Sequence, residues 1–227
     1  MGALADFIAP ARCAACGDAA DGDLCEYCST ALEIIGPPLC RRCGTPGTEA
    51  GPCIACRSLT AFGRARSLLV FGGPARRLVL VLKRRGSTSL AADAGRLLAD
   101  LARREGMDGR TVACVPAGRR ARARGFDHAE LLARAVGREL GVAFRRSLVR
   151  AGDASRQADV SIDRRRANVA SAFVSRPVTG AVLLVDDVYT TGATVDAGAR
   201  ALRAAGADRV DVLTLARTLR RHAGPRL

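Results

Sequence analysis

Residues 182–194 combine the side-chain types needed to bind a phosphorylated sugar. Four apolar residues, 182–185, predict a buried strand, and Asp186 and Asp187 follow where that strand is expected to end. The loop behind them leads into a helix through the small residues Thr190, Thr191, Gly192, Ala193 and Thr194. Backbone N–H groups at a helix N-terminus bind phosphate, and paired carboxylates suit ribose hydroxyls or a magnesium ion. An Asp-capped turn explains the pattern poorly, because an N-cap needs only one side-chain oxygen.

Cysteine pairs form a second chemical pattern, near the N-terminus. Eight of the nine cysteines lie in four C-x-x-C pairs, and the arrangement repeats after about 27 residues. The eight are Cys13, Cys16, Cys25, Cys28, Cys40, Cys43, Cys53 and Cys56. Two such pairs supply four thiolates, the number that tetrahedral zinc requires. We therefore predict two structural zinc sites, paired in sequence order, with no open position for a catalytic water.

The cysteine pairs also have alternatives to this zinc assignment. A disulfide framework needs an oxidising compartment, and residues 1–10 do not read as a signal peptide. Iron–sulfur ligation is a second alternative, although the even pairing favours zinc. An interleaved pairing of the ligands is a third. The ninth cysteine, Cys114, lies in an apolar segment and is expected to be a buried core thiol.

The candidate sugar site needs a parallel sheet to position it. From residue 66 onward, short apolar strands alternate with helical segments, which is typical of an α/β fold. The predicted strands are 67–71, 111–115, 181–186 and 209–215, and the predicted helices are 74–83, 90–104, 127–140 and 193–204. Ligands of such sheets bind beyond the carboxyl ends of the strands. We therefore expect the segments that follow residues 115 and 185 to share one edge.

A basic loop follows the predicted strand 111–115. It contains Gly118, Arg119 and Arg124, and a glycine turn with arginines at a strand end binds pyrophosphate through backbone N–H groups and guanidinium groups. We predict that Arg119 and a magnesium ion stabilise a leaving pyrophosphate. Residues 119–128, with Arg124 as a second catalytic residue, would close over the site. A solvated surface loop is the alternative explanation.

Two sets of residues resemble known families. Residues 182–194 resemble the motif with which type I phosphoribosyltransferases bind phosphoribosyl pyrophosphate (PRPP). Segments 80–86, 115–116, 124–133, 164–169 and 172–173 resemble the ComF family, and with the cysteine pairs this resemblance covers nearly the whole chain. It implies an α/β fold with a type I phosphoribosyltransferase-like parallel sheet flanked by helices in residues 61–227. A small double zinc ribbon in residues 1–60 would precede it.

The resemblance also implies roles for individual residues. Asp186 and Asp187 would hold the ribose hydroxyls and residues 190–194 the 5-phosphate, with Gly118 and Lys83 as further PRPP-binding residues. Lys83 is also explained as a helix residue whose amine reaches solvent. His128 stands where the family commonly has Gln, and we expect it to be a surface residue at a helix start, with a general base as the less favoured alternative. Glutamine use is not expected, because no glutaminase domain fits in residues 1–60.

The charge of the chain bears on its partners. The net charge is +14, and residues 1–60 contain four arginines against seven carboxylates, so the remainder carries +17. Such asymmetry suggests a polyanionic ligand, although an arginine-rich composition explains it equally well. A non-catalytic accessory protein that binds single-stranded DNA, with PRPP as regulator, is therefore the alternative function, although few aromatic residues are available for base stacking.

The remaining expectations concern partners and location. A third alternative for the function is a zinc-ribbon adaptor that docks on a DNA-uptake helicase or another partner. No apolar run is long enough to span a membrane. We therefore expect a cytoplasmic protein without a membrane partner, and a homodimer stays open.

Overall fold

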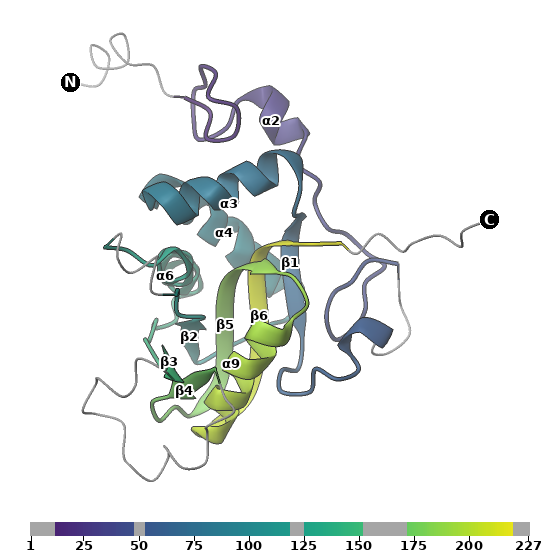
Figure 1. Cartoon of the computed structure of the whole chain (residues 1–227), viewed down its shortest axis with the longest axis vertical. Helices are drawn as coiled ribbons and strands as arrows, with labels where there is room; N and C mark the ends of the chain where they lie inside the picture. The colour runs from purple at the N-terminus through teal and green to yellow at the C-terminus, as the bar shows by residue number, and fades with distance from the viewer. Residues whose placement is uncertain (1–11, 48–52, 119–124, 152–171, 220–227) are drawn as a thin grey trace.

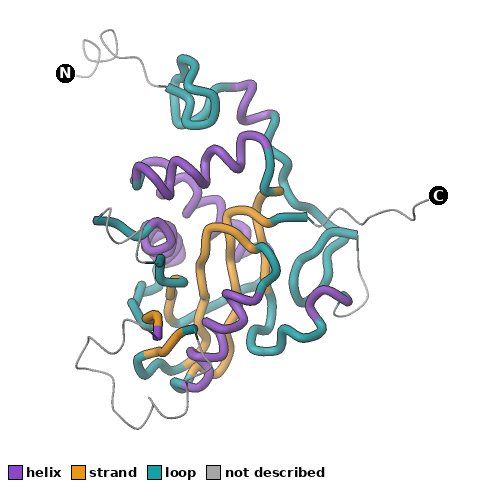
Figure 2. The backbone as a smooth tube through the Cα atoms, in the orientation of Figure 1, coloured by secondary structure: helices purple, strands orange, loops and turns teal. Residues whose placement is uncertain are grey.

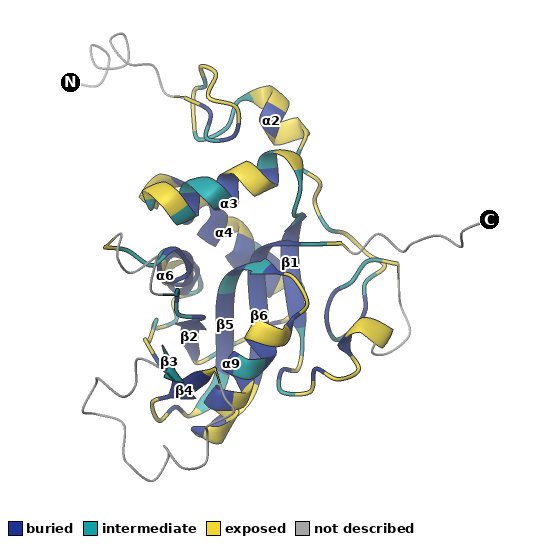
Figure 3. Ribbon diagram, in the orientation of Figure 1, coloured by how far each residue is buried: buried dark blue, intermediate teal, exposed yellow. Residues whose placement is uncertain are grey.

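A four-stranded parallel sheet forms the centre of the molecule (Figure 1). The computed structural model describes residues 12–47, 53–118, 125–151 and 172–219. In the order β1-β6-β5-β2, the strands are β1 (Ala65–Val70), β6 (Ala207–Arg217), β5 (Gly180–Tyr189) and β2 (Thr111–Cys114). Figure 3 shows that these strands are almost entirely buried, as expected for a parallel sheet covered on both faces. The four predicted strands are confirmed.

Strand β5 is longer than the sequence predicted. It pairs with β6 as far as Tyr189↔Arg217, whereas β2 pairs with β5 only as far as Cys114↔Val185. Asp186 and Asp187 therefore lie within the end of β5 and not beyond it. The predicted strand end was wrong because the ladder with β6, a tertiary contact, continues the extended backbone past the two carboxylates.

Helices cover both faces of the sheet (Figures 1 and 2). One face carries α3 (Gly73–Arg85), α4 (Thr88–Arg104) and α6 (His128–Leu140), and the other carries α9 (Ala193–Ala204) beside the antiparallel strands β3 (Leu148–Arg150) and β4 (Phe173–Ser175). Alternate strand residues divide between the two cores: Leu183 packs in the first and Leu184 in the second. The four predicted helices are confirmed. Among the described residues, no helix is both long and apolar enough to cross a membrane.

Local sequence sets the helix ends that meet at the carboxyl edge of the sheet. The Asp127 carboxylate caps α6 by accepting hydrogen bonds from the N–H groups of Ala129 (3.0 Å) and Glu130 (3.3 Å). Helix α3 ends at Gly86, whose φ of 60° lies in the left-handed region that glycine adopts readily. The first turn of α6 and the last turn of α3 are thereby fixed beside β5.

The cysteine-rich segment forms two lobes that lie apart in space (Figure 1). The first lobe contains α2 (Glu26–Thr30), and the second contains the 3₁₀ turn η1 (Ile54–Cys56). Between them the chain runs beside β1, where the N–H of Ile35 donates to the carbonyl oxygen of Leu68 (2.9 Å). The second lobe shares the core of the α9 face. The domain boundary at residue 60 stays a prediction.

Candidate functional site

Asp187 is held by basic side chains from two helices. Asp187 is only 5% exposed. Its Oδ2 lies 2.6 Å from Nζ of Lys83 and 3.3 Å from Nε2 of His128. Burial alone would raise the pKa of Asp187, but the contacts with His128 and Lys83 lower it below its usual value. Asp187 is therefore a fixed, ionised carboxylate.

Asp186 has the opposite electrostatic environment. Its Oδ1 accepts a hydrogen bond from the backbone N–H of Asp187 (2.9 Å). Burial, followed by the negative charge of Asp187, raises the pKa of Asp186 well above its usual value. A carboxyl group in this state attracts a cation or a hydroxyl donor, because either one favours its charged form. The two neighbouring acids therefore have different chemistry.

The loop between β5 and α9 presents hydroxyl groups to solvent. Thr190, Thr191 and Thr194 are exposed, and the hydroxyl oxygen of Thr191 accepts a hydrogen bond from the N–H of Ala193 (3.3 Å). The first N–H groups of a helix have no partner within the helix. Exposed hydroxyls together with these N–H groups give the start of α9 the donor chemistry of an anion site.

Gly192 is required by its backbone conformation and by its surroundings. Its φ is 83°, a value that residues with a side chain rarely adopt. A Cβ here would overlap the hydroxyl of Tyr189 and lie 2.6 Å from Cδ1 of Leu59. Leu59 belongs to the second cysteine lobe, and the N–H of Ala61 also donates to Oδ1 of Asp196 in α9 (2.9 Å). The second lobe therefore supports the loop that follows β5.

The chain after β2 turns across the same edge of the sheet. The N–H of Ala117 donates to Oδ2 of Asp127 (2.8 Å), which ties this turn to the start of α6. Gly118 is the last described residue of the turn. The predicted catalytic residues Arg119 and Arg124 lie outside the described residues.

A cavity of about 390 Å³ opens beside this turn. Its lining includes Phe126, Asp127, Glu130, Arg146, Leu148 and Arg176. Arg146 and Glu130 form an ion pair of 2.5 Å there. Cys114 also borders the cavity, and it is buried as predicted, with burial raising the pKa of its thiol well above the usual value. The cavity has both a ring face and charged groups with which to hold a small polar molecule.

His128 is the site residue that sequence reasoning missed. We expected a surface residue, but His128 is 8% exposed and contacts Asp187. Its Nδ1 is buried and has no hydrogen-bond partner among the described residues. The contact joins the start of α6 to the end of β5, so no spacing within one element could reveal it. The sequence signals were its position directly after the capping residue Asp127 and its place in the segment 124–133 that resembles the ComF family.

The eight paired cysteines form two tetrads. In each tetrad, the sulfur atoms all lie within 4.8 Å of one another. Burial alone would raise the pKa of Cys40, but backbone N–H groups of Cys43 and Cys53 lower it to about 6, which favours a thiolate. Four cysteine sulfurs this close together fit tetrahedral zinc. The chain therefore carries two zinc-binding sites, each formed by one cysteine tetrad.

The membership of the two tetrads decides the pairing question. The first consists of Cys13, Cys16, Cys25 and Cys28, and the second of Cys40, Cys43, Cys53 and Cys56. Pairing in sequence order is confirmed, and an interleaved arrangement is excluded. None of the nine cysteines, all of which are described, forms a disulfide.

Sequence comparisons identify relatives along most of the chain. A family model described as "Double zinc ribbon domain" matches residues 4–57. The "DNA utilization protein YhgH" of Salmonella typhi is 33% identical over 207 residues, covering 86% of this chain and 91% of the relative. The protein of the same name from Escherichia coli K12 is 31% identical with the same coverage.

Two solved structures are similar to part of the chain. One is described as the allosteric regulatory enzyme of purine biosynthesis, with 20% identity and a TM-score of 0.37. The other is glutamine PRPP amidotransferase from B. subtilis complexed with ADP and GMP, with 20% identity and a TM-score of 0.39. Each match covers 56% of this chain and 26% of the other, so the similar region spans about a quarter of those enzymes.

Proposed function

The chain belongs to the ComF-like family that includes the DNA utilization proteins YhgH, and from this premise we propose that it binds PRPP or another phosphorylated ribose. The proposed site is the carboxyl edge of the sheet, formed by Asp186 and Asp187 of β5 and by residues 190–194 at the start of α9. One observation carries the proposal. Asp186 and Asp187, the second of which contacts Lys83 and His128, stand directly before a hydroxyl-rich loop that opens a helix.

Each group at this edge suits one part of a phosphorylated ribose. The N–H groups at the start of α9 and the threonine hydroxyls are donors for a 5-phosphate. Asp186, whose charged form needs a partner, accepts hydrogen bonds from ribose hydroxyls. Lys83 and His128 hold Asp187 in place and keep it ionised. Asp186 would help to hold a magnesium ion, which would supply positive charge to the site when bound.

The reaction that this site suits is displacement of pyrophosphate at the anomeric carbon. The bond from carbon to the pyrophosphate oxygen breaks, a bond to a nitrogen nucleophile forms, and the nucleophile loses its proton. Ionised Asp187 favours positive charge that develops on the ribose ring. The cavity lined by Phe126 and Glu130 is the proposed place for the nucleophile. Arg119 and Arg124 remain the proposed partners of the leaving pyrophosphate.

Calorimetric titration tests PRPP binding directly. The zinc-loaded protein is titrated with PRPP and Mg²⁺ beside the Asp186→Ala/Asp187→Ala variant. Two charge-assisted hydrogen bonds of about 1.5 kcal/mol or more each are lost, so the affinity should fall at least about 100-fold. The control is Asp93→Ala/Asp100→Ala, which removes two exposed carboxylates from α4 and should bind as the unmodified protein does.

The outcomes separate the possibilities. Because Asp187 is buried, the single variant Asp186→Asn is measured as well, and it keeps an acceptor for the N–H of Asp187. Ribose 5-phosphate and pyrophosphate are titrated as competitors to identify which part of PRPP is recognised. No binding by a folded, unmodified protein would remove the proposal, as would equal binding by all variants. Saturable binding that both Asp186 variants lose would support it and justify assaying pyrophosphate release with nitrogen nucleophiles.

A second candidate function is binding of single-stranded DNA as a non-catalytic accessory protein. It rests on the charge of +17 in residues 61–227 and on the names of the relatives. Affinity for a labelled single strand should fall steeply with salt, and absence of binding at low salt would remove this candidate. Docking on a DNA-uptake helicase through the cysteine lobes is a separate proposal, tested by partner capture after deletion of residues 1–60. A cytoplasmic location and a homodimer also stay proposals.

A further inference from the structure

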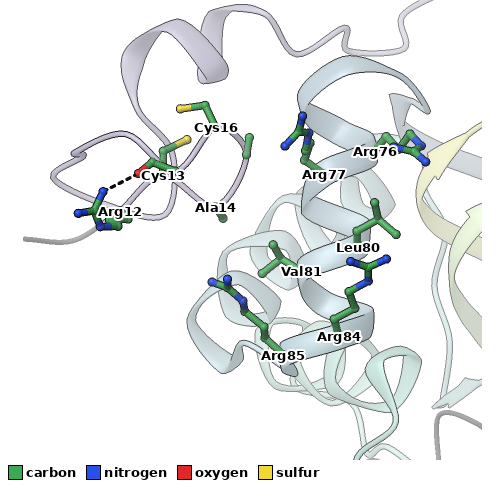
Figure 4. Close-up of a pocket in the computed structure, with 12 residues that line it drawn as sticks. Arg12, Cys13, Ala14, Cys16, Arg76, Arg77, Leu80, Val81, Arg84 and Arg85 are labelled. Atoms are coloured by element: carbon green, nitrogen blue, oxygen red, sulfur yellow. Dashed lines mark hydrogen bonds between the residues drawn. The ribbon is translucent and has the colours of Figure 1, made fainter.

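A groove separates the first cysteine lobe from the outer side of α3 (Figure 4). Its volume is about 590 Å³. Residues 12–17 of the lobe form one wall, and residues 76–85 of the helix contribute the other. The groove is distinct from the proposed PRPP site, because none of its lining residues belongs to that site.

Five of the side chains that line this groove are arginines, and the other ionisable side chains there are Cys13 and Cys16 of the first tetrad. The five are Arg12, Arg76, Arg77, Arg84 and Arg85. None of them forms an ion pair with a carboxylate among the described residues, whereas Arg96 and Arg103 of α4 each have an aspartate partner. Five positive charges without a carboxylate partner in one concave surface concentrate anions there. We call this surface the arginine groove.

One wall of the arginine groove, α3, is anchored to the core, and the other, the first lobe, is joined to the start of α4. Helix α3 packs on the sheet through Leu78, Val79 and Leu82, which are at most 4% exposed. The first lobe is held by its cysteine tetrad and by a hydrogen bond of 3.0 Å from the Ser89 hydroxyl to Oδ1 of Asp23. A ligand therefore meets arginines on a preformed surface, which reduces the entropy lost on binding.

The arrangement of the arginines suits a long anion better than a single phosphate. Arg77 and Arg84 are seven residues apart, which is roughly 10 Å along a helix axis. Arg12 belongs to the opposite wall, where its Nη1 donates to the carbonyl oxygen of Gly17 (3.1 Å; Figure 4). Between the arginines of the helix, Leu80 and Val81 give the groove an apolar floor. A chain with charges at regular intervals and apolar faces between them matches these features.

The chemistry of the lining suits a nucleic acid better than an acidic peptide. The side chains of the groove are arginines, which only donate hydrogen bonds, together with apolar residues and cysteines. A phosphodiester chain presents only acceptors and is matched by guanidinium groups. A peptide would also bury backbone N–H groups, for which the lining offers no carboxylate, amide or hydroxyl acceptor. The excess of guanidinium donors over acceptor side chains in this lining therefore favours nucleic acid.

We propose that the arginine groove binds the sugar–phosphate backbone of a single-stranded nucleic acid. Positively charged grooves that follow the backbone are the common device of proteins that bind single strands. Leu80 and Val81 contact sugars or bases, so recognition is insensitive to sequence. The inference rests on the second candidate function, for which it names the binding surface, and it is independent of PRPP binding.

Substitutions that remove the positive charges without reversing them test the groove. Arg76→Gln, Arg77→Gln, Arg84→Gln and Arg85→Gln are combined, since glutamine keeps the helix propensity of arginine. Binding of a labelled oligo-dT strand is followed by fluorescence anisotropy between 50 and 200 mM NaCl. The slope of log K against log salt should fall by about 3, and the affinity at 50 mM NaCl should fall at least tenfold.

The matched control removes the same charge elsewhere. Arg104→Gln, Arg110→Gln, Arg138→Gln and Arg145→Gln are exposed arginines outside the groove, and together they lower the net charge by the same four units. This control should keep most of the affinity and of the salt slope. The smaller variant Arg77→Gln/Arg84→Gln, with a slope reduced by about 1.5, serves if the fourfold variant does not fold. Helical content and zinc content are compared in every sample.

Each result has a separate meaning. If the unmodified protein does not bind the strand, the second candidate function fails and the groove fails with it. If groove and control variants lose equal affinity, binding follows overall charge and the groove is wrong, while the candidate function stands. Stronger competition by a duplex or by a polyglutamate peptide than by an unlabelled single strand would also overturn the groove. PRPP titration of the groove variant should be unchanged.

Discussion

At the scale of residues, Asp186 and Asp187 show how position decides chemistry. The two acids are neighbours in sequence, but only Asp187 reaches Lys83 and His128. The charge that those partners stabilise on Asp187 in turn disfavours a second charge on Asp186. A pair with divided protonation is ready to accept a cation or hydroxyl donors from a ligand. The energetic cost of this arrangement should be visible in the ligand-free protein.

Replacing Asp186 with Asn should stabilise the ligand-free protein at pH 7. The folded pKa of Asp186 is raised, so the folded state binds its proton more tightly than the unfolded state does. The protein therefore loses stability as the pH rises from about 3.9, the pKa of an aspartate in the unfolded chain, through the pKa of Asp186 in the folded state. Asn removes that loss and should raise the free energy of unfolding by about 0.5–2 kcal/mol, the usual size for a stabilising substitution.

Urea unfolding at several pH values measures this effect. The gain in Asp186→Asn should disappear below about pH 4, where the carboxyl is protonated in both states. Asp93→Asn on the exposed side of α4 is the control and should change stability little at any pH. A destabilised Asp186→Asn protein at pH 7 would contradict the raised pKa.

At the scale of elements, the end of β5, the loop and α9 form one unit with the second cysteine lobe. Leu59 packs against the position of Gly192, and Ala61 donates to Asp196 in the first turn of α9. At the end of β6, Arg217 donates to the carbonyl oxygen of Cys43 (2.5 Å). The second tetrad thus holds in place the loop that the proposed function assigns to phosphate.

Gly192→Ala should be more destabilising than Gly106→Ala. Both glycines have positive φ, and alanine there costs about 1–2 kcal/mol in backbone strain. Only at position 192 would the new methyl group also overlap Tyr189 and Leu59, whereas nothing lies within 4 Å at position 106. Thermal or urea unfolding should show a loss at least about 1 kcal/mol larger for Gly192→Ala. Equal losses would show that the loop yields to the added methyl group.

Metal analysis should find two zinc ions per chain, and the stability of the protein should depend more on the second zinc site than on the first. Cys56 is fully buried in the core of the α9 face, whereas Cys16 is exposed. Cys56→Ser should leave one zinc and lower the free energy of unfolding by more than about 3 kcal/mol, since the tetrad supplies folding free energy. Cys16→Ser should also leave one zinc but lower stability less.

Cys114→Ala is the control for this series. Its thiol is buried but belongs to neither tetrad, so the variant should retain two zinc ions as measured by metal analysis of the purified protein. Equal losses of stability in Cys16→Ser and Cys56→Ser would contradict the different burial of the two tetrads.

At the scale of the whole molecule, the two cysteine lobes are joined to the sheet in different ways. The first lobe stands outside α3 and forms a wall of the arginine groove. The second lobe is continuous with the core that contains Ala113 and Leu184. The repeat in the sequence therefore produces one peripheral lobe and one that is part of the main fold.

Truncation should reveal this difference. A chain of residues 33–227 keeps the second tetrad and the contact of Ile35 with Leu68, and it should unfold cooperatively with one bound zinc. A chain of residues 61–227 loses Leu59 and the second tetrad from the core. It should be unfolded or aggregated, as judged by circular dichroism and size-exclusion chromatography. A stable, folded 61–227 chain would instead confirm the predicted boundary.

Much of this protein was determined by the sequence itself, because the signals are local. Alternating apolar strands and helical segments predicted the parallel sheet, and regular cysteine spacing predicted both tetrads and their pairing. Metal ligands in C-x-x-C pairs are brought together by short turns. The acids of β5 and the loop after them could be predicted for the same reason, since all of these residues lie on one short segment.

Tertiary structure alone decided which charges meet. The length of β5 depends on β6, and the pairing of Asp187 with Lys83 and His128 joins three elements that are distant in sequence. The arginine groove likewise exists only where the first lobe lies against α3. Distances between side chains of different elements depend on how the elements pack, and packing depends on the whole core. For that reason the sequence indicated the chemistry, whereas the fold set the protonation of the acids and the position of the groove.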